Sequence, residues 1–267
     1  MKFLAFALAL TGILAHAEPA WKSELSSPAL GPHPALAPCV LDFQISWKGL
    51  LNSGSLKMEF APPDVKKAKA FVVRANATSL GAAASLFPYT ANFWAELNPI
   101  SLRPGYFQSI ETDREEIITH AVRYLPSAVE IRRTAKLTAT GKSSVGDTKF
   151  QFTPVFDIFS AMLHVRSQPL VVGDKIALVV CPSKAPILLR LKVTAREKHN
   201  GRDAIRLSLG IQKIDARTHE LKPYKKLRQE ATMWLSDDAA RIPIEFRAAV
   251  FIGDVRATLS KQAFGVQ

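Results

Sequence analysis

Residues Cys39–Lys48 read CVLDFQISWK, and apolar and polar side chains alternate along this stretch. Successive side chains of a β-strand point to opposite faces, so Leu41, Phe43, Ile45 and Trp47 would share one face. The opposite face would carry Asp42, Gln44, Ser46 and Lys48. Such alternation is typical of an antiparallel strand with one buried face and one solvated face.

The same alternation recurs twice in the second half of the chain. It runs through Ile187–Thr194, with Ile187, Leu189, Leu191 and Val193 on one face, and again through Ile205–Gln212. Turn residues separate these runs, including Asn52–Gly54, Thr140–Asp147 and His199–Gly201. We predict a mostly β fold, a strongly curved antiparallel sheet or open half-barrel of about ten strands, because twisted sheets of that size coil or close.

Two segments interrupt the alternation and are predicted to be helical. Ser79–Leu97 is rich in alanine but contains Pro88, and Pro154–Val165 carries apolar residues at helical spacing. We expect one or two helices packed on the concave side of the sheet. Asp157 would lie in the first turn of the second helix and Arg166 just beyond its last turn, where each charge suits the helix dipole.

The N-terminus resembles an export signal. Lys2 precedes a short apolar run, and Ala15-His16-Ala17 fits a cleavage site. We therefore predict a signal peptide over residues 1–17, a flexible Pro/Ala/Ser-rich lead-in over residues 18–38, and a single β-rich domain over residues 39–267. The protein would be exported to the periplasm or another extracytoplasmic compartment and, after cleavage, would not span a membrane. Its oligomeric state is left open.

The chain is strongly basic, with a formal net charge of +12. Export argues against nucleic acid as a partner, so anionic envelope lipids or polymers are the expected alternatives. A basic hairpin surface would include Lys213, Arg217, Lys222, Lys225, Lys226 and Arg228. Such a run of charge is also compatible with an ordinary solvated loop.

Two cysteines, Cys39 and Cys181, lie in the predicted domain. An oxidising compartment would permit a disulfide between them. Two separate buried thiols, packed as small apolar side chains, are the alternative. The sequence leaves both open.

The stretch Trp234–Phe246, WLSDDAARIPIEF, places two adjacent carboxylates between two apolar runs. Glycosidases need two carboxyl groups about 5 Å or more apart across the sugar, whereas adjacent aspartates suit a turn. We therefore predict that Asp237 and Asp238 shape a hairpin. The histidines show no metal-ligand spacing, and no nucleophile motif is present, so we predict no metal, no cofactor and no catalytic residues. We favour a non-enzymatic protein over a hydrolase, although the sequence leaves enzymatic activity open.

An ordered set of motifs is similar to an exported bacterial family known as domain of unknown function 3108. The matching segments are Trp47-x-Gly49 with Gly54, Asn98–Pro104, Asp157–Arg166, Pro169-Leu170, Gly173-Asp174, Trp234–Asp238, Arg241–Pro243, Gly253 and Leu259. The resemblance covers residues 40–260 and implies no established activity and no catalytic residues. It implies an antiparallel sheet curled round a helix, similar to periplasmic lipoprotein carriers and lipocalin-like proteins; a shared fold does not fix function.

The leading hypothesis is therefore an envelope protein that binds a lipid or another apolar ligand on its curved sheet. The candidate ligand-binding residues are Phe87, Phe93, Trp94, Phe156 and Phe159. These aromatics would either line a pocket or fill the sheet as core, which is the commoner role of buried aromatic residues. The alternative function is envelope interaction or assembly through the basic hairpin.

Overall fold

The computed structural model describes residues 18–27, 31, 33–61, 70–183, 185–225, 227–250 and 253–265. The predicted signal peptide and Lys226 lie outside the described residues.

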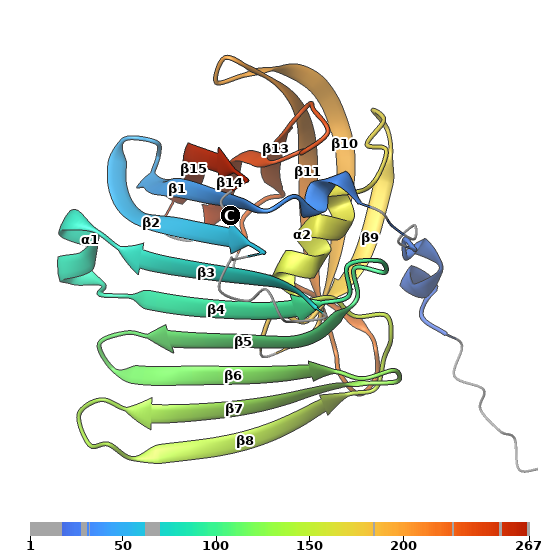
Figure 1. The fold of residues 1–267 in the computed structure, drawn as a ribbon. Helices are drawn as coiled ribbons and strands as arrows, with labels where there is room; N and C mark the ends of the chain where they lie inside the picture. Colours follow the sequence, from blue (N-terminus) through green and yellow to red (C-terminus); the bar gives the residue numbers. More distant parts are fainter. Residues whose placement is uncertain are drawn as a thin grey trace, which may run out of the picture.

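A single antiparallel sheet makes up most of the molecule (Figure 1). Its first eight strands are β1 Cys39–Trp47, β2 Leu51–Phe60, β3 Phe71–Ser79, β4 Thr90–Leu97, β5 Pro104–Thr112, β6 Glu116–Tyr124, β7 Val129–Leu137 and β8 Ser143–Phe150. The others are β9 Lys175–Val180, β10 Ile187–His199, β11 Arg202–Ile214, β12 Leu221–Pro223, β13 Ala231–Ser236, β14 Pro243–Val250 and β15 Gly253–Phe264. Over the described residues the sheet thus has 15 strands rather than about ten, because several strands lack the clean alternation on which the prediction rested.

Strand β1 joins the two halves of this sheet. The spatial order runs from β8 back to β1, then through β15, β14, β13, β11 and β10 to β9, while β12 pairs with β11. The alternation predicted for β1 is present, and Leu41 and Phe43 are buried. Trp47, on the same face, is the last residue of the strand and is 41% exposed. The curved antiparallel sheet predicted from the sequence is confirmed.

Helix α2, Ile158–Arg166, lies inside the curl of the sheet (Figure 1). Phe159 and Leu163 pack into a first core, to which strands from β1 to β11 contribute, whereas Ala161 and Val165 pack into a second core formed with β9, β10, β11, β13 and β14. Residues four apart share a helix face, so two different faces of α2 pack into the two cores. Helix α2 thus contributes side chains to both cores inside the curl.

The helix begins at Ile158, not at Pro154 as predicted. Asp157 is the N-cap, and its carboxylate accepts hydrogen bonds from the backbone N–H groups of Phe159 and Ser160. Phe156, just before the cap, instead donates its N–H to Val179 O of β9 at 2.8 Å. This pairing with β9 holds the preceding residues outside the helix.

The helix predicted over Ser79–Leu97 is largely wrong. Only α1, Gly81–Leu86, is helical; it lies at the left-hand strand ends in Figure 1 and not on the concave side. Residues from Thr90 form β4, where alanines alternate with larger residues and pair with β3 and β5. Alanine favours helices in isolation, but pairing on both sides decides the outcome here.

The lead-in predicted to be flexible is docked over its described residues. It contains two short 3-10 helices, η1 Ala20–Glu24 and η2 Pro34–Leu36. The Trp21 indole is buried and donates to His219 O at 2.9 Å. Ser26 N–H donates to Ala177 O at 2.9 Å, and Ala177 N–H donates to Ser26 Oγ at 3.1 Å. This segment covers the edge of β9, a role that its own composition does not reveal.

Candidate functional site

The aromatic residues predicted to bind a ligand are only partly brought together. Phe93 and Phe159 lie with ring centroids 6.1 Å apart, and Phe107 lies 6.2 Å from Phe159 and 6.3 Å from Phe93. Phe159 is only 4% exposed, and Phe107 is fully buried. These rings fill the interior against α2, as core packing rather than as the wall of an open pocket.

The other three predicted residues lie elsewhere. Phe156 belongs to the second core and packs edge-on against His164, with centroids 5.3 Å apart. Trp94 follows Phe93 on β4, so its side chain lies on the outer face, where its Nε1 donates to Glu96. Phe87 follows α1 and is 77% exposed. The five residues therefore form no common site.

A polar cluster on the inner face of β5 and β6 was not identified from the sequence. Ser109 Oγ lies 3.3 Å from Glu111 Oε1 and 3.5 Å from His120 Nδ1. The Glu111 carboxylate approaches the same nitrogen, at 3.9 Å. A nucleophilic triad needs the serine and the carboxylate on opposite ring nitrogens. This cluster lacks that relay geometry and acts as a hydrogen-bond network.

Tyr89 extends this network by donating its hydroxyl to Glu111 Oε2 at 3.0 Å. Partial burial of this half-exposed side chain, together with the charge of Glu111, raises the pKa of Tyr89, so the phenol remains a donor at neutral pH. Ser109 and Glu111 are polar residues at i and i+2, so they share one face of β5. This spacing is the signal in the sequence that could have revealed the cluster.

Buried polar groups also surround α2. Burial raises the pKa of Asp157, and burial reinforced by the charge of Arg103 lowers the pKa of His164 to about 4. Burial lowers the pKa of Arg166 to about 10, so this side chain remains cationic at neutral pH. Arg166 is the last helical residue rather than lying beyond the helix, and it donates to Ala240 O at 2.9 Å.

Asp237 and Asp238 lie in the connection between β13 and β14, in agreement with the turn interpretation. Asp238 Oδ1 accepts the N–H groups of Ala240 and Arg241, each at 2.9 Å. Asp237 pairs with Arg196. The guanidinium of Arg241, in the same turn, donates to Arg166 O at the end of α2. This hydrogen bond connects the helix to the β13–β14 connection. Both carboxylates thus have partners that stabilise the turn.

The cysteines are free and buried, and both belong to the core that also contains Phe159 and Leu163 of α2. Burial raises the pKa of Cys39 and raises the pKa of Cys181 to about 12. Both groups are therefore thiols at neutral pH and pack as small apolar side chains.

The predicted basic surface is assembled only in part. Lys213 and Lys222 are direct partners in the β11–β12 pairing, and Arg217 lies in the turn between those strands. Lys222 Nζ lies 2.7 Å from Asp215 Oδ2, which offsets one of these charges. Lys225 and Arg228 are exposed beyond β12. The described basic residues form a loose, partly neutralised surface.

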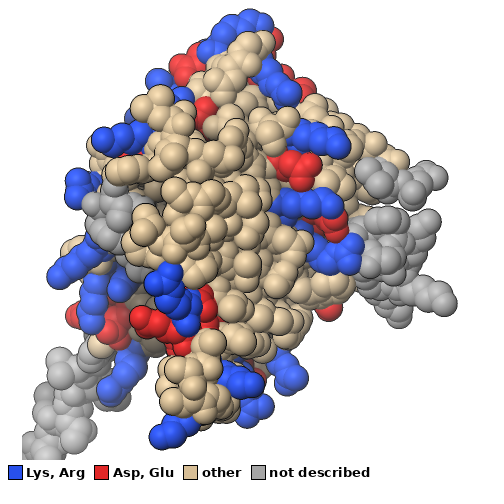
Figure 2. Space-filling view, turned by 90° about the vertical axis from the view of Figure 1, so that its left-hand side faces the viewer, with Lys and Arg blue, Asp and Glu red and all other residues tan. Residues whose placement is uncertain are grey.

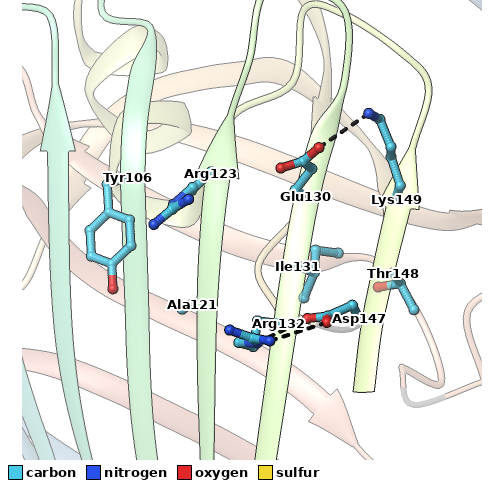
Figure 3. Close-up of a pocket in the computed structure, with 9 residues that line it drawn as sticks. All are labelled: Tyr106, Ala121, Arg123, Glu130, Ile131, Arg132, Asp147, Thr148 and Lys149. Carbon is cyan, nitrogen blue, oxygen red and sulfur yellow. Dashed lines mark hydrogen bonds and ion pairs between the residues drawn. The ribbon is translucent and has the colours of Figure 1, made fainter. Parts of the chain in front are cut away.

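A groove of about 500 Å³ crosses the outer face of β5–β8 (Figure 3). Tyr106, Ala121, Arg123, Glu130, Ile131, Arg132, Asp147, Thr148 and Lys149 line it. Lys149 pairs with Glu130 and Arg132 pairs with Asp147, both at 3.1 Å. These ion pairs are solvent-exposed and contribute little energy, so the groove provides no desolvated anchor for a ligand.

The clearest candidate is an apolar area at the strand ends, which we call the strand-end surface. Its exposed members are Trp47, Leu50, Leu51, Leu80, Leu86, Phe87 and Tyr89. Leu50 is 90% exposed and Leu86 is 66% exposed. Figure 2 looks onto this side of the molecule and shows Lys, Arg, Asp and Glu mainly around the margins of a broad area without them.

Two connections build the strand-end surface. In the β1–β2 hairpin, Lys48 and Gly49 have positive φ angles of 53° and 71°, and Leu50 N–H donates to Trp47 O at 3.0 Å. Lys48 and Gly49 are the central residues of this tight turn, and Leu50 follows them directly, before β2 begins. The second connection, from β3 through α1 to β4, lies alongside it, because Leu80 N–H donates to Ser53 O at 3.0 Å.

Cations lie beside these apolar residues. The Arg114 guanidinium donates to Ser85 O at 2.9 Å, beside Leu86. Lys48 Nζ lies 5.4 Å from the centre of the Trp47 ring. Exposed apolar groups bordered by amphipathic aromatics and cations are typical of surfaces that contact a membrane interface or another protein.

Within the described residues, no group of three or more His, Cys, Asp or Glu side chains is placed to hold a metal ion. A search of the same residues finds no helix with the length and apolar character needed to cross a membrane.

Comparisons with known proteins identify a family and a fold. The model of the family described as "Protein of unknown function (DUF3108)" matches residues 42–260. A crystal structure of a beta-barrel-like protein of domain of unknown function DUF1849 from Brucella abortus has a TM-score of 0.54 and 9% sequence identity. That match covers 87% of this chain and 99% of the other, and at this identity it shows the fold alone. No curated protein matches the chain.

Proposed function

This chain belongs to the DUF3108 family of proteins of unknown function, and we propose that it is an exported, non-enzymatic protein that binds lipid membrane surfaces through its strand-end surface. The observation that carries the proposal is the exposure of Leu50 and Phe87 at adjacent strand connections. Single exposed apolar residues are ordinary, but a contiguous group of them is typical of an interaction site.

The interior of the curl supports this choice by contrast. Phe93, Phe107 and Phe159 pack against one another around α2, so these rings are not available to a lipid chain. The apolar residues of the strand-end surface are already in contact with solvent and need no opening of the core. An apolar partner is therefore better accommodated at the strand ends than inside the curl.

The composition of the strand-end surface favours a bilayer interface. Trp47 and Tyr89 have an apolar ring with a polar group, which suits the headgroup region. Lys48 and Arg114 can interact with lipid phosphates while their aliphatic stems cover apolar area. The export signal predicted for residues 1–17 would bring the protein to an envelope compartment, where such membranes are present.

The energy available is sufficient for reversible binding. Full burial of a Leu or Phe side chain contributes about 1.5–3 kcal/mol. Leu50 and Phe87 together would therefore contribute several kcal/mol, and attraction to anionic lipids adds about 1 kcal/mol for each Lys or Arg near the surface.

Vesicle binding by the purified mature protein tests the proposal. Wild-type protein should sediment with vesicles of phosphatidylcholine and phosphatidylglycerol, and Leu50→Ser combined with Phe87→Ser should reduce binding more than tenfold. Ile100→Ser is the matched control, because Ile100 is 58% exposed but lies in the β4–β5 connection, at the other end of these strands. Equal binding by the double variant, or no binding by wild type, would refute the proposal.

A further inference from the structure

The two edge strands of the sheet differ in how far other segments of the chain cover them. Strands β8 and β9 lie at the two ends of the strand order. The edge of β9 is covered by Ser26, which exchanges two hydrogen bonds with Ala177, and by Phe156, which bridges to Val180. In β8, all residues from Ser143 to Lys149 are exposed. One edge is thus covered by the chain itself, and the other faces solvent.

Of the usual devices that prevent a free edge from pairing, strand β8 has charged side chains but neither a proline nor a bulge. Its sequence, SSVGDTKF, contains no proline. It pairs with β7 in one continuous register, from Val129 opposite Phe150 to Lys136 opposite Ser143. Bulges, prolines and inward-pointing charges normally discourage edge-to-edge pairing. Strand β8 therefore presents an edge without a bulge or a proline to solvent, and its charged side chains decide what can pair with it.

The two charged residues of β8 are arranged in a self-complementary way. Asp147 and Lys149 are two residues apart, so both project to the outer face, where they pair with Arg132 and Glu130 of β7 (Figure 3). Ser144, Gly146 and Thr148 on the inner face carry no charge. An antiparallel partner of β8 would best present a cation opposite Asp147 and an anion opposite Lys149.

We propose that β8 pairs antiparallel with β8 of a second copy of this chain, about a two-fold axis at Thr148. This register places Asp147 of each copy opposite Lys149 of the other, so the same favourable pair forms twice. A shift of one step, with the axis at Asp147, would place the two aspartates opposite each other. Charge therefore selects one register among those that keep the outer faces together.

The paired segment in this register runs from Gly146 to Phe150 in each copy. Such a short pairing predicts a weak, reversible dimer in which backbone hydrogen bonds supply affinity and the charges supply register. The strand-end surface does not take part, so this association is independent of the proposed membrane binding.

Charge exchange tests the pairing. Lys149→Glu makes the edge wholly acidic and Asp147→Lys makes it wholly basic, so each variant alone should dimerise roughly tenfold or more weakly than wild type. An equimolar mixture of the two should restore association, because every opposed pair is again of opposite sign. The double variant carrying both substitutions should also dimerise like wild type. Sedimentation velocity of the mature protein over a concentration series measures these constants.

Glu130→Lys is the matched control, because it breaks the same ion pair with Lys149 but lies on β7, away from the edge. It should dimerise like wild type. Melting curves establish that each variant is folded. A wild type that stays monomeric at its highest soluble concentration would overturn the proposal, as would a dimer insensitive to Lys149→Glu or a mixture that fails to associate.

Discussion

Phe159 and Phe87 have the same side chain, and both are candidates for the same ligand site on sequence grounds, yet their environments are opposite. Phe159 is 4% exposed and packs with two other phenylalanines around α2, whereas Phe87 is 77% exposed beside α1. The comparison separates two uses of apolar residues in one sheet. In the interior they hold the curl around its helix, and at the strand ends they remain available to a partner.

Truncation of the interior ring should have the largest effect. Phe159→Ala removes a buried ring from a packed cluster and should lower the free energy of unfolding by about 3–5 kcal/mol. Phe87→Ala should change it by less than about 0.5 kcal/mol, because the ring is mostly in solvent. Urea denaturation measures both. Similar losses for the two variants would remove the distinction between interior and strand ends.

Acid should weaken the interior through His164. The folded pKa of about 4 lies below the usual value near 6.5, so the folded state binds fewer protons than the unfolded state between these values. The contribution of the neutral imidazole to the free energy of unfolding is therefore fully present above about pH 6.5. Up to about 3 kcal/mol of it is lost as the pH falls towards 4. His164→Gln should flatten this part of the stability profile. Parallel profiles for the variant and wild type would contradict the assignment.

The N-cap of α2 should have an intermediate effect. Asp157→Ala removes the acceptor for two backbone N–H groups, and loss of such a cap costs about 0.5–2 kcal/mol. The melting temperature should fall by a few degrees. Asp157→Asn keeps an acceptor and should lose less. If the alanine and asparagine variants melt together with wild type, the cap does not hold the helix as described.

The β13–β14 turn should be the least sensitive. Asn in place of both Asp237 and Asp238 keeps the side-chain oxygens that accept backbone hydrogen bonds and removes only the charge. The exposed pair with Arg196 is worth about 0.2–1 kcal/mol, so the double variant should stay within about 1 kcal/mol of wild type and keep its vesicle binding. A loss of vesicle binding in the folded double variant would assign these carboxylates a role beyond the turn.

The sequence predicted the features that depend on local pattern. Alternation in Cys39–Lys48 identified β1 and its buried Leu41 and Phe43, and apolar residues at helical spacing identified α2. It failed where distant pairing overrides local preference, as in the alanine-rich β4. The docking of Ser26 on Ala177 joins residues 151 positions apart, which no local pattern reveals.

The strand-end surface was missed for a different reason. Leu50 and Phe87 lie in connections far apart in the sequence, and only the sheet brings those connections side by side. The turn predicted at Asn52–Gly54 is wrong, because the structure places the turn at Lys48–Leu50 and Asn52–Gly54 within β2. A leucine directly after Lys48-Gly49 is the signal that was available. Turn tips are ordinarily polar, so an exposed leucine there is informative.

The most direct test of the comparison is a fluorescent probe on each end of the strands. The native thiols are buried with raised pKa values, so a cysteine introduced at an exposed position can be labelled selectively. An environment-sensitive probe on Leu50→Cys should shift to shorter wavelength when anionic vesicles are added, and the same probe on Ile100→Cys should not. Equal shifts at both positions, or none at Leu50→Cys, would contradict membrane contact through the strand-end surface.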